Sequence, residues 1–502
     1  MTEKIEKKSD EFSSKDCKIE YIEKNDVESL KANAPTAPFV YSNEEKKVKR
    51  KIDRSFLPLV IAILFTQFID KTSINTAAVM GLLEDTHITH DQFGIIGGIF
   101  YFGYLAFQIP NNYLVHRVQI SKYMGLILVV WGVSFGCTSL ATNFGVLAAL
   151  RVILGFWEAV TYPCIFLLIA MFYRRHEQVF YISYMFLANA VATAFGGLIA
   201  FGIANMDGLN GISAWKYAYL IWGAITVSLG ILTFFFLPDQ PKSKWFRLTP
   251  EEEKIVDQRR LDNGTSTNTD FNINQIYEGL KDPRYYCFCA LSFLCNLQNG
   301  SITVFSSQII QEIGFTNLQA ILLNIPNGAS GAILISISFL LSKRFQELNF
   351  IGMGMTLVSL AGVLILGLVP SGAAKLIGIY LAYACTPIYI LTQTNISNNV
   401  KGNSKKVFYT SSQLVFYCLG NFVGPTIMTS NQAPRYMGAM LGYAAANIIC
   451  FVLFGYVRWS LVRSNRNRVH NTSCDTAGQS ENSKDVVDDR TDVEDLTFIY
   501  RP

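Results

Sequence analysis

Residues 150–171, LRVILGFWEAVTYPCIFLLIAM, form an apolar run that contains both an arginine and a glutamate. At about 100° per residue, Gly155, Glu158 and Tyr162 fall within about 40° of Arg151 on a helix, so both charges share one face. A charged side chain at membrane depth costs about 3 kcal/mol on insertion scales and normally faces a bundle interior or a water-filled cavity. The run therefore predicts a membrane-spanning helix with one polar face turned away from lipid.

The composition places the chain among polytopic membrane proteins. Its 502 residues are 50% hydrophobic and 16% charged, whereas soluble domains carry about 25% charged residues. Residues 1–54 are hydrophilic, so we expect no secretory signal, and we expect the first apolar segment to be retained as an anchor. The 10 cysteines show no metal-ligand spacing and are interpreted as small core residues, so no metal or cofactor is expected.

Apolar segments of spanning length occur in two groups of six, separated by a hydrophilic stretch. The pattern predicts an all-α membrane protein with 12 transmembrane helices in two six-helix halves. The expected parts are an N-terminal tail (1–54), a first half (55–237), a central loop (238–283), a second half (284–462) and a C-terminal tail (463–502). The expected crossings are 55–79, 93–115, 123–142, 146–173, 179–204, 216–237, 285–310, 317–342, 350–370, 373–397, 407–429 and 436–462.

Basic residues fall in every second loop. Short cytoplasmic loops retain Lys and Arg, so we expect these loops and both termini to be cytoplasmic. The intervening loops 80–92, 205–215 and 311–316 contain no Lys or Arg. The basic positions are the N-terminal flank, Arg117, Lys122, Arg174, Arg175, the central loop, Lys343, Arg344, Lys401, Lys405, Lys406, Arg458, Arg463, Arg466 and Arg468.

The central loop contains a helix-start signal. Thr249 suits an N-cap, Pro250 the first helical position, and residues 251–253 are all glutamates in the first turn. Two interpretations remain: a solvated helix that links the halves, or a regulatory docking site.

The first expected crossing contains the sequence FTQFIDKTSINTAA at 65–78, with Asp70 and Lys71 adjacent. Charges in an apolar helix either line a transport pathway or neutralise each other or a neighbour. In the pathway interpretation, Lys71 binds an anionic group and Asp70 is a candidate for proton coupling.

Arg151 and Glu158 leave the same two interpretations open. Arginine presents a planar fork suited to carboxylate or phosphate, and a desolvated carboxyl group can exchange protons during a working cycle. The pair therefore predicts an anion site at Arg151 and a proton switch at Glu158. The alternative is a helix-packing salt bridge with Asp70 or Lys71.

Further polar residues lie in the second, seventh and tenth crossings. Tyr104, Asn296 and Asn299 are the candidate substrate contacts among them, although such groups can also satisfy one another in packing. The cluster that runs from Asn296 to Gly300 is expected to break its helix beside a site at the membrane midplane. The other polar positions noted are Tyr101, Gln108, Gln298, Gln393, Thr394 and Asn395.

The energy source is inferred from a missing motif. The sequence has no nucleotide-binding G-x-x-x-x-G-K-[ST] loop, which disfavours an ATP-driven pump. A gradient is then expected to drive transport, and acidic and basic side chains favour protons over sodium.

The motifs resemble a known family over nearly the whole chain. The layout of two six-helix groups is similar to the major facilitator superfamily, and the motifs resemble its anion:cation symporter family, in particular the fungal allantoate permease-like branch. The matching stretches are IDKTSIN at 69–75, RVILGFWEAVTYP at 151–163, AWKYAYLIWG at 214–223, LPDQPKSKWFRLTPEEEKIVDQRRLDNG at 237–264, VKGNSKKVF at 400–408, APRYM at 433–437 and DVEDLTFIY at 492–500.

The resemblance implies proton-coupled uptake of a small organic anion, such as a carboxylate vitamin, a ureide or a sulfur compound. It implies roles in anion contact and proton coupling for Arg151 and Glu158, and a cation near the place of Lys71. A multi-pass protein of the plasma membrane, acting as a monomer without nucleic-acid partners or enzymatic activity, is expected. The alternatives are an exporter or uncoupled facilitator, and a nutrient-sensing receptor that resembles a transporter.

Overall fold

The computed structural model describes residues 42–115, 117–262, 272–369, 372–433, 435–475, 490–495 and 498–502. The chain divides into two compact units, residues 1–50 and 51–502, and the features described below belong to the second. Regular structure in the described residues is helical.

The long helices fall into two groups along the chain. The first group is α2 (Asn43–Ala77), α4 (His90–Val115), α5 (Ile120–Cys137), α6 (Phe144–Glu158) with α7 (Thr161–Phe172), α8 (Arg175–Ala204) and α9 (Ala214–Phe236). The second is α12 (Pro283–Glu312), α13 (Asn317–Leu323) with α14 (Ile325–Phe345), α15 (Leu348–Leu368), α16 (Ala374–Ala382) with α17 (Cys385–Asn399), α18 (Asn403–Ile427) and α19 (Met437–Asp475). Shorter elements are η1 (Ala78–Leu82), α3 (Leu83–Thr86), η2 (Thr138–Leu140), η3 (Leu209–Gly211), η4 (Lys244–Phe246), α10 (Pro250–Asp262), α11 (Ile273–Lys281) and η5 (Ser430–Gln432).

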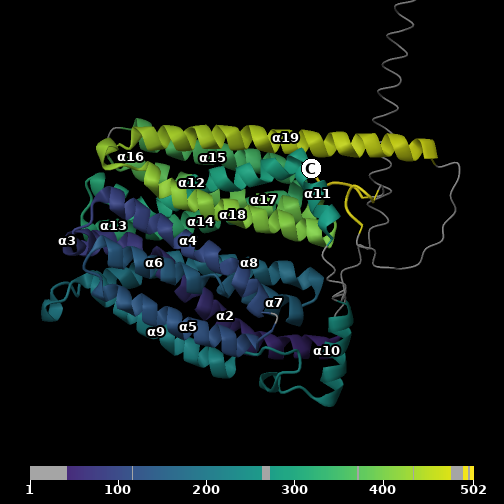
Figure 1. The fold of residues 1–502 in the computed structure, drawn as a ribbon, viewed down its shortest axis with the longest axis horizontal. Coiled ribbons are helices and arrows are strands. Elements are labelled where there is room, and N and C mark those ends of the chain that lie inside the picture. Colours follow the sequence, from purple (N-terminus) through teal and green to yellow (C-terminus); the bar gives the residue numbers. More distant parts are fainter. Residues whose placement is uncertain are drawn as a thin grey trace, which may run out of the picture. The chain divides into compact units, whose positions relative to one another are not determined.

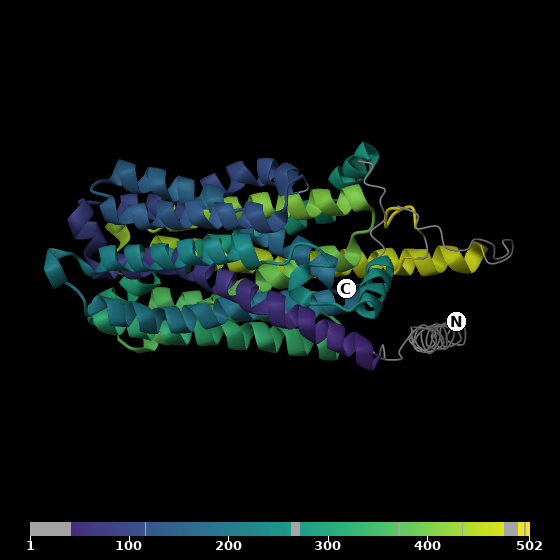
Figure 2. The same ribbon diagram turned by 90° about the horizontal axis from the view of Figure 1, so that it is seen from below.

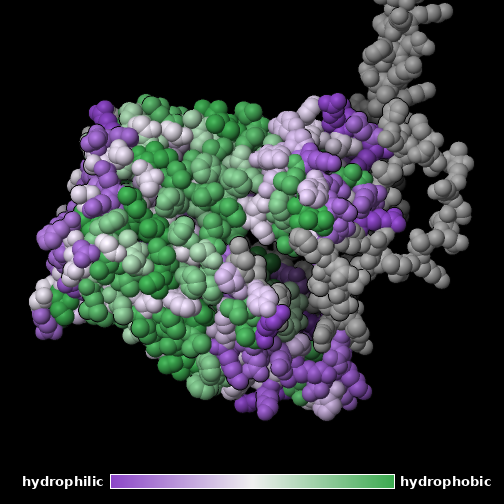
Figure 3. Space-filling model, in the orientation of Figure 1, coloured by the Kyte–Doolittle hydropathy of each residue, from purple (hydrophilic) through white to green (hydrophobic). Residues whose placement is uncertain are grey.

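These helices confirm the expected all-α architecture of twelve crossings. Within the described residues, 9 helical stretches are long and apolar enough to cross a membrane. The other three crossings are α4, α8 and α18, with 26, 30 and 25 residues, more than the roughly 20 that span a bilayer core. The long helices run along one common axis (Figures 1 and 2). On the face shown in Figure 3, hydrophobic residues cover the middle of the helices and hydrophilic residues gather at the ends.

Each half is held by close helix pairs. In the first half α5 packs along α9 and α4 along α6, and in the second α12 packs along α18 and α15 along α19. Glycine makes the α4–α6 contact possible, because a Cβ at Gly155 would stand 1.9 Å from the Phe100 carbonyl oxygen and one at Gly103 2.0 Å from that of Val152. The glycine between Arg151 and Glu158 therefore sets how close α6 lies to α4.

Replacing Gly155 with alanine is expected to destabilise the first half by about 3 kcal/mol, the upper end of typical overpacking costs, because the new methyl group meets backbone atoms that cannot rotate away. The unfolding midpoint of the purified protein measures the effect. The control is Gly136→Ala on α5, where an added Cβ meets nothing within 4 Å. Equal midpoints for the two variants would contradict the close packing of α4 and α6.

The central loop begins its helix as predicted and packs on the first half. The Thr249 N–H donates to Glu252 Oε2 at 2.8 Å and the Glu252 N–H donates to Thr249 Oγ1 at 3.4 Å, a reciprocal capping box. Lys51 Nζ lies 2.6 Å from Glu252 Oε2, and buried Arg259 lies 2.6 Å from Glu177 Oε2. We call this end of the bundle the central-loop end, and the end that carries α3 and η5 the opposite end.

Three crossings are broken where the sequence predicted continuous helices. The fourth is interrupted between α6 and α7, the eighth between α13 and α14, and the tenth between α16 and α17. Each break has a proline just after it, Pro163, Pro326 or Pro387, and proline has no N–H to donate to the carbonyl four residues earlier. The buried Asn111 amide donates to the Ala159 carbonyl at 3.4 Å instead.

The expected break at Asn296–Gly300 is wrong. Helix α12 is continuous from Pro283 to Glu312. The amide of Asn296 donates to the Ser292 carbonyl at 2.7 Å, and Gln298 reaches across to the Ala382 carbonyl at 2.7 Å. These side chains bond to carbonyls without displacing the backbone ladder of α12, so the helix does not open.

Candidate solute site between the two halves

Lys71 lies on α2 where the first half meets the second. Its Nζ donates a hydrogen bond to the Tyr417 hydroxyl of α18 at 3.1 Å and lies 4.9 Å from the centroid of the Tyr101 ring of α4. Lys71 and Tyr417 are both half-buried. Within the described residues, no carboxylate oxygen lies within 4.0 Å of Nζ. A cation at this depth whose nearest neighbours are aromatic rings and a hydroxyl, and which makes no salt bridge with the described residues, is suited to receive an anionic group.

Asp70, Arg151 and Glu158 lie behind Lys71, inside the first half. Each is only 2–3% exposed. Asp70 accepts from Thr226 Oγ1 at 3.1 Å, Arg151 donates to the Tyr219 hydroxyl at 2.9 Å, and Glu158 accepts from Gln67 Nε2 at 3.2 Å.

The helix-packing salt bridge considered for these charges does not form. Among the described residues, neither Arg151 nor Lys71 lies within 4.0 Å of Asp70 or Glu158. Three buried polar atoms in this region also have no hydrogen-bond partner among the residues that the structure describes: Gln67 Oε1, Asp70 Oδ1 and Arg151 Nε. Orphaned polar groups of this kind are expensive in a finished protein core and are typical of functional sites.

The other three candidate substrate contacts differ in how far their polar groups are already buried or hydrogen-bonded. The Tyr104 ring packs against Phe100 at 6.3 Å, and its hydroxyl makes no hydrogen bond with the described residues. Asn296 is buried, and its amide oxygen accepts from Asn421 at 3.0 Å, so it serves the packing of α12 on α18. Asn299 is half-buried and donates to Asn421 Oδ1 at 2.9 Å, so it is bonded yet still partly accessible.

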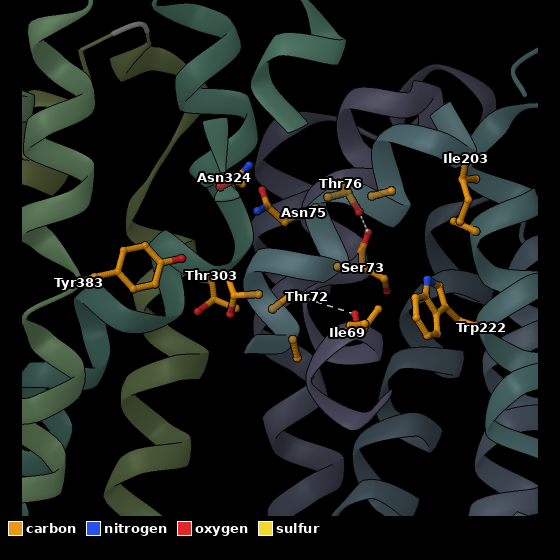
Figure 4. Close-up of a pocket in the computed structure, with 16 residues that line it drawn as sticks. Ile69, Thr72, Ser73, Asn75, Thr76, Ile203, Trp222, Thr303, Asn324 and Tyr383 are labelled. Carbon is orange, nitrogen blue, oxygen red and sulfur yellow. Dashed lines mark hydrogen bonds between the residues drawn. The ribbon is translucent and has the colours of Figure 1, made fainter. Parts of the chain in front are cut away.

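A cavity of about 50 Å³ lies between the halves, next along α2 from Lys71. In Figure 4, Tyr383, Thr303 and Asn324 lie on one side of α2, and Ile203 and Trp222 on the other. The labelled α2 residues are Ile69, Thr72, Ser73, Asn75 and Thr76, so α2 contributes mainly polar groups to a mixed lining in which no residue is charged. Arg151 and Glu158 are absent from this lining, so the sequence-based expectation that they border the passage is not met at this cavity.

The halves are joined at the opposite end. Buried Asn75 donates to Ser306 Oγ at 2.7 Å and accepts from the Ser307 N–H at 2.9 Å. Further out, Ser430 donates through its N–H and its hydroxyl to Asp91 at 2.7 and 3.1 Å. The Tyr436 hydroxyl lies 3.0 Å from His90 Nε2 and donates to Glu312 at 2.6 Å.

Tyr436→Phe is expected to favour opening of this end by about 1 kcal/mol, since it removes the hydrogen bond to His90 across the halves, whereas the bond to Glu312 lies within the second half. Distances between spin labels at Thr89 and Asn431 measure the opening. Tyr217→Phe is the control, because the Tyr217 hydroxyl bonds within the first half, to the Leu209 carbonyl. An unchanged distance distribution in Tyr436→Phe would contradict a role in closure.

Sequence reasoning missed Tyr417 and Asn421. They stand one helical turn apart in YCLGNFVGP at 417–425, where Gly420 and Gly424 already mark the close contact with α12. Polar residues beside such glycines face a neighbouring helix rather than lipid, which is the signal that was available.

Comparison with known proteins gives the family. The model of the Major Facilitator Superfamily matches residues 60–425. An uncharacterized transporter of Schizosaccharomyces pombe is 34% identical over 464 residues, covering 91% of this chain and 89% of that protein. The allantoate permease of Saccharomyces cerevisiae is 29% identical over 497 residues, covering 96% and 91%. A crystal structure of a bacterial homolog to the human lysosomal transporter Spinster superposes with a TM-score of 0.63 at 14% identity, covering 81% of this chain and 96% of that one.

The matches confirm the resemblance to allantoate permease-like fungal transporters, and the class is a transporter rather than an enzyme. Because the family model covers residues 60–425, well over half of the chain, this protein belongs to the major facilitator superfamily.

Proposed function

We propose that the protein is a proton-coupled symporter that imports a small organic anion, such as a carboxylate vitamin, a ureide or a sulfur compound. The observation that supports this most directly is Lys71, a half-buried cation between the halves with no carboxylate within 4.0 Å among the described residues. The allantoate permease, a relative over most of its length, is named for an anionic ureide.

In the proposed cycle, the opposite end opens and the anionic group of the solute replaces the Tyr417 hydroxyl at Lys71. Asn299 and Tyr104 contact the rest of the solute. Arg151 is held by Tyr219 and adds positive potential from behind, and it reaches the solute only if that bond opens. Asn296 is the weakest of the five proposed contacts, because both ends of its amide are already bonded.

We assign proton coupling to Glu158 first and to Asp70 as the second candidate. Glu158 ends α6 directly before the break at Ala159–Val160, so a change in its charge acts beside a carbonyl, that of Ala159, which has no helical N–H partner because residue 163 is proline. A carboxyl group out of water exchanges a proton in response to nearby charge, and the arrival of an anion at Lys71 supplies such a change.

The domain boundaries and the orientation are part of the proposal. We place residues 55–237 and 284–462 as the two halves, and the tails and central loop in the cytoplasm, on the charge pattern of the loops. We also propose the plasma membrane, on the resemblance to transporters such as the allantoate permease, and a monomeric state, on a passage built by one chain.

The test is a screen of vitamins, ureides and sulfur compounds for uptake in cells that lack their own carriers, at two external pH values. The proposal expects saturable uptake of one or more anions, faster at the lower pH. In vesicles, a pH gradient should drive accumulation. Equilibration without accumulation would indicate a facilitator, and outward movement an exporter.

A further inference from the structure

The C-terminal residues 490–495 and 498–502 lie against the central-loop end of the second half. The C-terminus lies beside α11 (Figure 1), and Thr491 Oγ1 donates to Glu278 of α11 at 2.9 Å. None of these residues belongs to the proposed solute site.

A buried ion cluster anchors the start of this segment. Lys405 at the start of α18 is 0% exposed and Asp492 is 1% exposed. Lys405 Nζ lies 2.7 Å from Asp492 Oδ1 and 2.8 Å from Glu278 Oε1. Burial by itself lowers the pKa of Lys405, but the two carboxylates outweigh burial and raise it. Lys405 is therefore charged at neutral pH, and removing Asp492 would take away one of the two carboxylates that compensate this buried cation.

The end of the segment is anchored on other helices. The buried Tyr500 hydroxyl donates to Asp492 Oδ2 at 2.8 Å, and the Tyr500 backbone N–H donates to Asn465 of α19 at 3.0 Å. The Arg501 N–H donates to Asn399 of α17 at 2.7 Å, and the Pro502 carbonyl accepts from the Leu348 N–H of α15 at 3.2 Å. The segment thus joins the ends of α15, α17, α18 and α19, the elements of the second half that must move together when that half rocks.

Thr491 is a residue of this segment whose modification would directly oppose docking. Its hydroxyl donates to Glu278 and accepts from the Glu494 N–H at 3.3 Å, and its side chain is fully buried. A phosphate there would carry nearly two negative charges within hydrogen-bond distance of a carboxylate and beside Asp492, and like-charge repulsion of this kind disrupts a docked segment. Lys405 offers little compensation, because it already contacts both carboxylates.

The sequence around Thr491 is TDVED, with acids one, three and four positions after the threonine. Protein kinases that select acidic sequences act on such a pattern. The kinase would transfer the terminal phosphoryl group of a nucleoside triphosphate to Thr491 Oγ, breaking its bond to the departing nucleoside diphosphate, while the hydroxyl proton leaves.

We propose that residues 491–495 and 498–502 form a clamp on the central-loop end of the second half, which phosphorylation of Thr491 releases. The docked segment ties the ends of four helices together, and release frees them to move independently of the tail. Because Thr491 is buried, the kinase acts on the transiently undocked segment, and the phosphate then prevents its return.

Hydrogen exchange of the backbone amides of residues 491–495 and 498–501 tests the clamp in the full-length protein in lipid nanodiscs. Thr491→Glu and Asp492→Asn are each expected to speed exchange at least tenfold. Thr491→Ser, which keeps the hydroxyl, and Val493→Ala, at a half-exposed side chain, are the controls and should keep wild-type protection. Wild-type protection in both Thr491→Glu and Asp492→Asn would overturn the clamp.

The phosphorylation step has its own test, which does not depend on any solute. Incubation of the full-length protein with an acid-directed kinase and ATP should place phosphate on Thr491 and speed exchange as in Thr491→Glu, whereas Thr491→Val should take up no phosphate there. Phosphate on Thr491 with an unchanged exchange rate, or no phosphate on Thr491 at all, would overturn the release mechanism.

Discussion

Lys71→Gln is expected to raise the KM for the transported anion by about 10- to 100-fold, the size of a lost hydrogen bond to a charged group. Glutamine is one bond shorter than lysine but keeps an N–H donor on the side of the Tyr417 hydroxyl, so the change removes the charge and leaves a polar side chain between the halves. The maximal rate should change less than the KM, because the charge is proposed to bind the solute rather than to move the halves.

The control for Lys71→Gln is Lys216→Gln. In the wild type, the Lys216 ammonium packs over the Trp215 ring at the opposite end of the bundle. Its KM should match the wild type. An unchanged KM in Lys71→Gln at normal surface expression would remove Lys71 from the solute site, whatever the solute proves to be.

Glu158→Gln is expected to abolish the dependence of uptake on external pH, so that the solute only equilibrates. A pH difference of one unit supports about tenfold accumulation for each coupled proton, and this accumulation should fall to unity in the variant. The neutral side chain can still accept the Gln67 hydrogen bond, so the fold around α6 is preserved. Accumulation ratios in vesicles with an imposed pH gradient measure the effect.

Two variants make the test of Glu158 specific. Glu347→Gln at the central-loop end, where Glu347 pairs with Arg458 at 3.1 Å, should keep normal coupling. Asp70→Asn should weaken coupling less than Glu158→Gln, because Asp70 bonds to Thr226 deeper in the first half. Intact pH-dependent accumulation in Glu158→Gln would show that the proton binds elsewhere.

The architecture could be predicted from the sequence, because the lengths of the apolar segments and the charges of the loops determine it. The twelve crossings and the Thr249 cap each follow from a local pattern of residues. The helix breaks in the fourth and tenth crossings did not, because Pro163 and Pro387 lie within apolar runs, and hydropathy does not register a missing N–H. These breaks can be found only by asking which backbone carbonyls lose their N–H donor to a proline, and here they are those of Ala159 and Tyr383.

The site could be predicted only in part. The sequence identifies Asp70 and Lys71 as adjacent charges, but one residue on a helix turns a side chain by about 100°, so they face different neighbours. Lys71 meets the second half and Asp70 faces Thr226 within the first. Asn296 and Asn299 could not be ranked either, because the partner that bonds both of them, Asn421, lies more than a hundred residues away.

The most direct test of the account is charge rescue at Lys71. Lys71→Cys should be nearly inactive in uptake, and a small cationic methanethiosulfonate reagent should restore much of the activity, whereas an anionic reagent of similar size should not. The wild-type chain, treated in parallel, controls for reaction at its other cysteines. Equal effects of both reagents, or failure of either to reach the introduced cysteine, would contradict a water-accessible cation site between the halves.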